Sequence, residues 1–86
     1  MGYLFPMVTI CRHAGFRIVI YTNDHDPAHV HAIKAGGEAK INLMGAAGAP
    51  ALVWADGLNR GEVRRAIQIV EDNCTAFIAE WRKIHG

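Results

Sequence analysis

The last third of the chain repeats apolar residues three and four positions apart, and this pattern constrains the fold most. The stripe consists of Val63, Ala66, Ile67, Val70, Cys74, Phe77, Ile78, Trp81 and Ile84. Such spacing is typical of one face of an amphipathic helix. Asn59 is a suitable N-cap, and Glu62, three residues later, completes a capping box. We therefore expect one long helix over residues 59–84, whose apolar face needs a partner layer.

The preceding residues form short extended runs separated by turn signals. Residues 8–12 and 16–22 flank His13-Ala14-Gly15, a three-residue connection that predicts a hairpin with a bulge. Residues 29–35 and 38–43 flank Gly36-Gly37, a strong hairpin signal. Residues 51–54 are a candidate short edge strand. The predicted fold class is α+β: a small antiparallel sheet of three to five strands covered by one long C-terminal helix.

Length and composition narrow the class of protein. The 86 residues make one domain, 1–86, and an apolar fraction of 51% with 20% charged residues excludes a disordered chain. A net charge of +1 does not call for a polyanion-binding surface. Cys11 and Cys74 match no zinc-site spacing and are interpreted as buried, reduced thiols. No run approaches the length of a membrane span, so we expect a soluble, cytoplasmic protein with no membrane partner.

The strongest functional signal is a dense group of histidines and aspartates. Three of the five histidines and half of the aspartates lie in Asp24-His25-Asp26-Pro27-Ala28-His29-Val30-His31. On a strand, His29 and His31 project from one face, whereas Val30 and Ala32 face the helix. Pro27 stiffens the approach to the strand. This geometry allows His25 to converge with the other two imidazoles.

Three interpretations of this cluster remain open. In the first, His25, His29, His31 and Asp26 bind a divalent metal such as zinc. In the second, His25, His29, His31 and Asp24 are the catalytic candidates for acid–base chemistry without a metal, with Asp24 or Asp26 as the orienting carboxylate. In the third, the aspartates cap the turn, and the histidines are exposed or bonded to the backbone. The residues do not decide whether the protein is an enzyme.

Other polar groups carry weaker signals. Arg60, Arg64 and Arg65 lie at the helix start, where cations oppose the macrodipole; they contact phosphate or form a solvated face, and we favour the solvated face. His13 at a turn and His85 near the C-terminus are predicted to have no function.

The residues described so far resemble a small prokaryotic family known as a domain of unknown function. The family pattern has two short strands, Asp-His-x-Pro-x-His-x-His and a C-terminal helix, and Asp24, His25, Pro27, His29 and His31 match its motif. Ala28 stands where family members commonly have a second proline. Members often begin at the position equivalent to Met7, so residues 1–6 are interpreted as an N-terminal extension. The resemblance implies that Asp24 and the three histidines are the site. It also implies a gene beside that of a second small protein, as in toxin–antitoxin pairs.

The leading functional hypothesis is a small cytosolic component of a toxin–antitoxin-like module that acts through the His/Asp cluster on RNA or on a partner protein. One alternative is a non-catalytic metal-binding module. Another is a structural domain that completes its core on a partner chain. That partner can be a second copy of the same chain, in a homo-oligomer.

Overall fold

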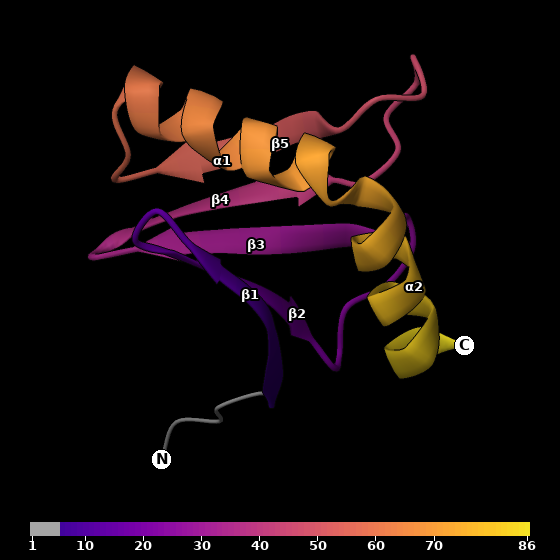
Figure 1. Ribbon diagram of the computed structural model, residues 1–86. Coiled ribbons are helices and arrows are strands. Elements are labelled where there is room, and N and C mark those ends of the chain that lie inside the picture. Colours follow the sequence, from indigo (N-terminus) through magenta and orange to yellow (C-terminus); the bar gives the residue numbers. More distant parts are fainter. Residues whose placement is uncertain (1–5) are drawn as a thin grey trace.

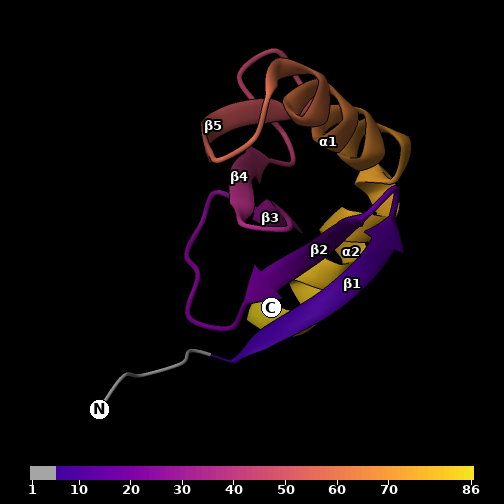
Figure 2. The same ribbon diagram turned by 90° about the vertical axis from the view of Figure 1, so that its left-hand side faces the viewer.

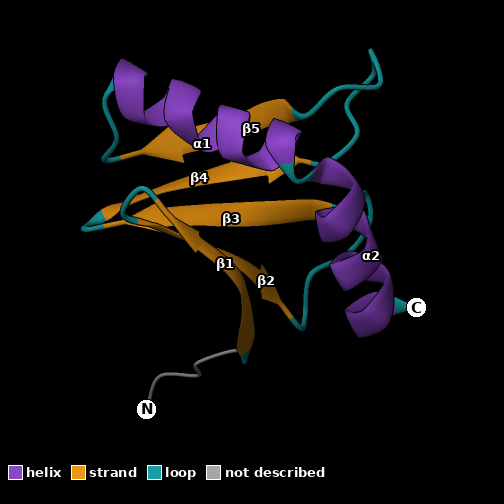
Figure 3. Cartoon of the chain, in the orientation of Figure 1, coloured by secondary structure: helices purple, strands orange, loops and turns teal. Residues whose placement is uncertain are grey.

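Five antiparallel strands and two helices make up the chain in a computed structural model, which describes residues 6–86 (Figures 1 and 3). The elements are β1 (Met7–His13), β2 (Phe16–Tyr21), β3 (His29–Lys34), β4 (Gly37–Asn42), β5 (Ala51–Asp56), α1 (Arg60–Asp72) and α2 (Cys74–His85). The strands lie in the sheet in chain order, so the predicted α+β class is confirmed with five strands. Apart from Pro6, the predicted N-terminal extension lies outside the described residues. Neither helix is long and apolar enough to cross a membrane.

Two tight turns fix the strand register. Ala14 and Gly15, both with positive φ, connect β1 to β2, so the turn is one residue shorter than predicted and the bulge lies between Thr9 and Cys11 instead. The β3–β4 turn falls on Ala35 and Gly36, and Gly37 already belongs to β4. A Cβ on Gly37 would lie 2.4 Å from the Gly57 carbonyl oxygen, so this close approach of two backbones requires glycine.

One face of the sheet forms the core with both helices. Opposed pairs such as Val30 with Ile41 and Ile18 with Ala32 are completely buried. The buried cluster is Phe16, Ile18, Ile20, Val30, Ala32, Ala39, Ile41, Leu43, Ala66, Ile69, Val70, Phe77 and Trp81. The sheet is strongly twisted, and the β1–β2 hairpin turns away from β4 and β5 (Figure 2). The predicted orientation of Val30 and Ala32 toward the core is confirmed.

The prediction of one long helix is wrong, because the helix breaks at Asn73. The Asn73 side-chain amide donates to the Ile69 carbonyl at 2.8 Å, and its backbone N–H donates to the Val70 carbonyl at 3.2 Å. Both bonds replace regular helical bonding, and the Asn73 backbone leaves the helical region (φ −120°, ψ 16°). α1 therefore lies over β4 and β5, whereas α2 changes direction and runs past the beginning of β3 (Figure 1). The predicted capping box of Asn59 and Glu62 is confirmed.

Candidate metal centre

Asp24 is held in place by the end of β2. Its backbone N–H donates to the Tyr21 carbonyl at 3.0 Å, and its Oδ2 accepts the Tyr21 backbone N–H at 3.2 Å. These two bonds form a tight turn directly after the strand. They point the carboxylate back over the sheet, toward β3.

His29 and His31 extend from β3 on the face opposite the core, as the alternation of the strand predicts. Their ring centroids are 5.2 Å apart. Both side chains are nonetheless buried, with 3% and 7% of their residue surfaces exposed. Trp81 of α2 packs 5.1 Å from the His29 ring, and Tyr21 packs edge-on 4.7 Å from the His31 ring. The two imidazoles are therefore fixed by aromatic neighbours on both sides.

The two histidines meet the carboxylate through the same ring atom. His29 Nε2 lies 3.1 Å from Asp24 Oδ2, and His31 Nε2 lies 3.6 Å from the same oxygen. The three residues each place one potential ligand atom within 4.8 Å of the other two. Both Nε2 atoms are buried and make no geometrically acceptable hydrogen bond within residues 6–86.

The other ring nitrogen of each histidine has a fixed partner. His29 Nδ1 lies 2.9 Å from the Pro27 carbonyl oxygen, which can only accept, so Nδ1 carries the proton. His31 Nδ1 lies 2.9 Å from Glu38 Oε2 on β4, and donates to it when Glu38 is ionised. A neutral ring with its proton on Nδ1 has its lone pair on Nε2, which in both histidines lies toward Asp24.

Burial lowers the pKa of His31 below its ordinary value of 6.5. The carboxylates of Asp24 and Glu38 act in the opposite direction, and neighbouring His29 adds to the lowering. The pKa of Tyr21 is raised, first by burial and then by the charges of Glu38 and Asp24. At neutral pH His31 is therefore a neutral imidazole, and Tyr21 keeps its phenolic proton.

The structure brings together only some of the residues predicted for the site. Asp24, His29 and His31 converge, whereas His25 and Asp26 are exposed and lie outside the group. The carboxylate beside the imidazoles is thus Asp24 instead of Asp26. The reason is local: the Tyr21–Asp24 turn directs the Asp24 side chain inward, before the chain reaches His25.

Glu38 is a site residue that sequence reasoning missed. It opposes Ile33, and is therefore a diagonal neighbour of His31 on the same face of the hairpin. A turn at Gly36-Gly37 would instead place Glu38 opposite Ala35 and move it away from His31. The one-residue error in the turn therefore hid this contact.

A cavity of about 210 Å³ adjoins the group. It is lined by Asp24, His25, Asp26, Trp81, His85 and Gly86. The His85 ring stacks 4.0 Å from the Trp81 ring, and its Nε2 is buried without a hydrogen-bond partner. His85, for which the sequence predicts no function, thus forms part of the cavity wall, because α2 ends beside the Asp24 loop.

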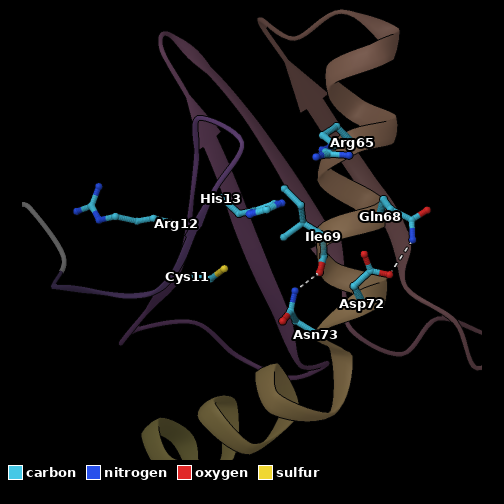
Figure 4. A pocket seen from close by; sticks show the side chains of 8 residues that line it. All are labelled: Cys11, Arg12, His13, Arg65, Gln68, Ile69, Asp72 and Asn73. Atoms are coloured by element: carbon cyan, nitrogen blue, oxygen red, sulfur yellow. Dashed lines mark hydrogen bonds between the residues drawn. The ribbon is translucent and has the colours of Figure 1, made fainter.

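A second cavity, of about 380 Å³, opens between β1 and α1 (Figure 4). His13 points from β1 toward Ile69, and Arg65 lines the same cavity from α1, whereas Arg12 points away. The Asp72 carboxylate already accepts a bond from Gln68 at 2.8 Å. Among the described residues, the metal-ligand geometry occurs only in the Asp24 group and not in this cavity.

Comparison with protein-family models gives a match over residues 15–82, to the family described as Domain of unknown function (DUF4160). The chain belongs to this family. The matched segment contains Asp24, His29, His31 and Glu38, as well as Trp81. Comparisons with curated proteins and with solved structures gave no match. The predicted membership of a family of unknown function is confirmed, while the prokaryotic origin and the paired gene stay predictions.

Proposed function

We propose that this protein binds one divalent transition metal through Asp24, His29 and His31. The observation that carries the proposal is the convergence of two buried, unpartnered imidazole nitrogens on one carboxylate oxygen. Two histidines and one carboxylate are a common ligand set for such metals.

The assigned protons support a cation between these atoms. With Nδ1 as the donor in both rings, the Nε2 of a neutral ring presents a lone pair to an oxygen that also carries lone pairs. Three electron-pair donors repel one another unless a positive charge lies among them. A single proton would satisfy only one of the two imidazoles, and the lowered pKa of His31 keeps that ring neutral at pH 7. A metal ion would satisfy all three donors at once.

The spacing also suits a metal. Zinc bonds to nitrogen and oxygen are about 2.0–2.2 Å long, so tetrahedral ligand atoms lie about 3.4 Å apart. The Nε2–Oδ2 separations of 3.1 and 3.6 Å bracket that value. The Pro27 carbonyl and the Glu38 carboxylate are outer partners of the kind that orient metal-binding histidines.

The number of ligands favours a reactive centre over a purely structural one. Structural zinc sites have four protein ligands, whereas catalytic sites have three and leave a position for water or substrate. Asp24 also lines the cavity beside Trp81 and His85, so small molecules have access next to the ligand set. A metal held by these three residues would lower the pKa of a bound water and so supply a hydroxide nucleophile near neutral pH.

A role as a component of a toxin–antitoxin-like module that acts on RNA or on a partner protein stays a proposal. A metal-activated water would give it a chemical means, because such a nucleophile cleaves phosphodiesters without a nucleophilic side chain. RNA integrity in cells that express wild type or His29→Gln tests this part. Equal RNA cleavage by both proteins would exclude a role for the metal centre.

The experiment for the metal itself is direct. Purified protein, stripped with a chelator, is titrated with zinc, nickel or manganese in a calorimeter, and metal content is measured by mass spectrometry. We expect close to one metal per chain and loss of binding in Asp24→Asn, His29→Gln and His31→Gln. Glu38→Gln keeps all three ligands but removes the carboxylate charge beside His31 Nδ1, so its affinity should fall by roughly tenfold.

His25→Gln is the matched control, because His25 belongs to the same loop but lies outside the ligand group. It should bind metal like wild type. No binding of any of the three metals, or equal loss in His25→Gln and His29→Gln, would refute the proposal.

A further inference from the structure

The free edge of β5 has unpaired backbone groups and exposed apolar side chains, and its sequence contains no lysine or proline. β5 is the last strand of the sheet and pairs only with β4, so its outer backbone groups have no strand partner. Leu52, Val53 and Trp54 on this strand are 41–46% exposed. Edge strands are normally protected by lysine, proline or a covering segment. β5 contains neither residue, and its one charged side chain is Asp56 at its end.

An apolar cavity extends from this edge to the first turns of α1. Its volume is about 490 Å³, and it is lined by Leu52, Leu58, Arg60, Val63 and Arg64. Its lining thus combines three aliphatic side chains with two arginines. A strand added beside β5 would pass along this cavity with every second side chain directed toward α1.

The two arginines have no counter-charge of their own. Among residues 6–86, no carboxylate lies within ion-pair distance of Arg60 or Arg64. The nearest acid in sequence, Glu62, caps the helix through Asn59 and pairs with Lys34 at 3.8 Å. Arg60 is the first residue of α1, at the positive end of the helix, where a cation is unfavourable, and Arg64 lies one turn later. Both arginines are exposed, as a solvated face predicts, so an acidic group from outside the chain can reach and pair with them.

A second copy of this chain does not supply that acid. Its other free edge, β1, carries Arg12 and His13 and no acidic residue. In β5 itself, Asp56 shares a face with Trp54, opposite Glu38 and Lys40, whereas Leu52 faces the arginine side with Ile41. Two paired copies of β5 would therefore leave the arginines without partners and add two more cations.

We propose that β5 binds an extended acidic segment of a different protein as a sixth strand. Backbone groups of the segment pair with the free edge. An aliphatic side chain of the segment enters the cavity and contacts Leu52, Leu58 and Val63 there. Carboxylates at alternate positions, about 7 Å apart, pair with Arg60 and Arg64, which are about 6 Å apart along the helix. In this binding mode the segment adds a strand to the sheet, and the two arginines select segments with acidic side chains. It is independent of the metal centre, because none of its residues is a metal ligand.

A designed peptide tests the proposal. The probe is Val-Leu-Val-Glu-Val-Glu-Val with blocked ends and a fluorescent label, and the matched probe has lysine in place of both glutamates. Anisotropy titration with the full chain should show saturable binding of the acidic probe only. The double variant Arg60→Gln/Arg64→Gln should weaken it by about fivefold, with the remaining affinity insensitive to salt.

Arg82→Gln is the matched control, since Arg82 is an exposed arginine on α2, away from β5. It should bind the probe like wild type, and circular dichroism should show that all variants are folded. Equal binding of the acidic and basic probes, or no binding of either, would overturn the proposal. So would a dimer in light scattering that Val53→Lys dissociates, because the occupant of β5 would then be a second copy.

Discussion

At the scale of single residues, His31 shows how a buried imidazole is kept neutral beside two carboxylates. Asp24 and Glu38 favour its protonated form, yet burial outweighs them and its pKa is lowered. The carboxylate of Glu38 therefore serves to accept the Nδ1 proton, with Oε2 2.9 Å from Nδ1, and to fix the ring. His29 achieves the same orientation through the uncharged Pro27 carbonyl. The two rings thus present Nε2 in the same way. The orientation of His31 depends on a charged partner, whereas that of His29 depends on an uncharged one.

The lowered pKa of His31 predicts a dependence of stability on pH in metal-free protein. The unfolded chain binds a proton at His31 near pH 6.5, whereas the folded chain does so only at lower pH. Between these values the unfolded state holds more protons, so stability falls as pH falls. The melting temperature should be level above pH 7 and decrease as pH drops below 6.5. Thermal unfolding in the presence of a chelator, from pH 8 to pH 5, measures this.

His31→Gln should remove a large part of that decrease, because glutamine does not titrate. His25→Gln should leave the wild-type slope, since His25 is exposed. An unchanged slope in His31→Gln would assign the decrease to another group and contradict the neutral state of this ring.

At the scale of elements, α2 connects the core to the site through Trp81. The indole is 5% exposed, belongs to the buried cluster and packs against the His29 ring. Trp81→Ala should therefore cost roughly 3–5 kcal/mol of unfolding free energy, a large share of what a small domain has. Trp54→Ala, on the exposed edge strand, should cost much less. Urea unfolding followed by circular dichroism compares the two, and equal midpoints for Trp81→Ala and wild type would disprove the packing.

The elements were predictable wherever a local signal sets them. The capping box at Asn59 marks the start of α1, and alternation along β3 places His29 and His31 together. The break at Asn73 was not predictable from periodicity, because Val70, Cys74 and Phe77 continue the apolar stripe across it. Glu38 and Trp81 reach the histidines through hairpin register and helix direction. Hairpin register and helix direction both depend on tertiary structure, which cannot be predicted from the spacing of residues along the chain.

At the scale of the whole molecule, the candidate metal centre lies where three segments meet. Asp24 belongs to the loop after β2, His29 and His31 belong to β3, and Trp81 brings α2 against His29. Within this loop Asn23, His25 and Asp26 are exposed. A metal ion would therefore cross-link the loop to the sheet and, through the histidine, stabilise the packing of α2.

This position predicts that metal binding and folding are coupled. A ligand that binds only the folded state at 100 times its dissociation constant adds about 2.7 kcal/mol of stability. In a domain of this size each kcal/mol raises the melting temperature by about 4–8 °C, so saturating zinc should raise it by roughly 10–20 °C. His29→Gln should abolish the rise, and His25→Gln should keep it, because only His29 contributes to the ligand group. Differential scanning fluorimetry with and without zinc gives the comparison. A rise of similar size in His29→Gln would mean that zinc stabilises the fold from another site, and the three-ligand centre would have to be abandoned.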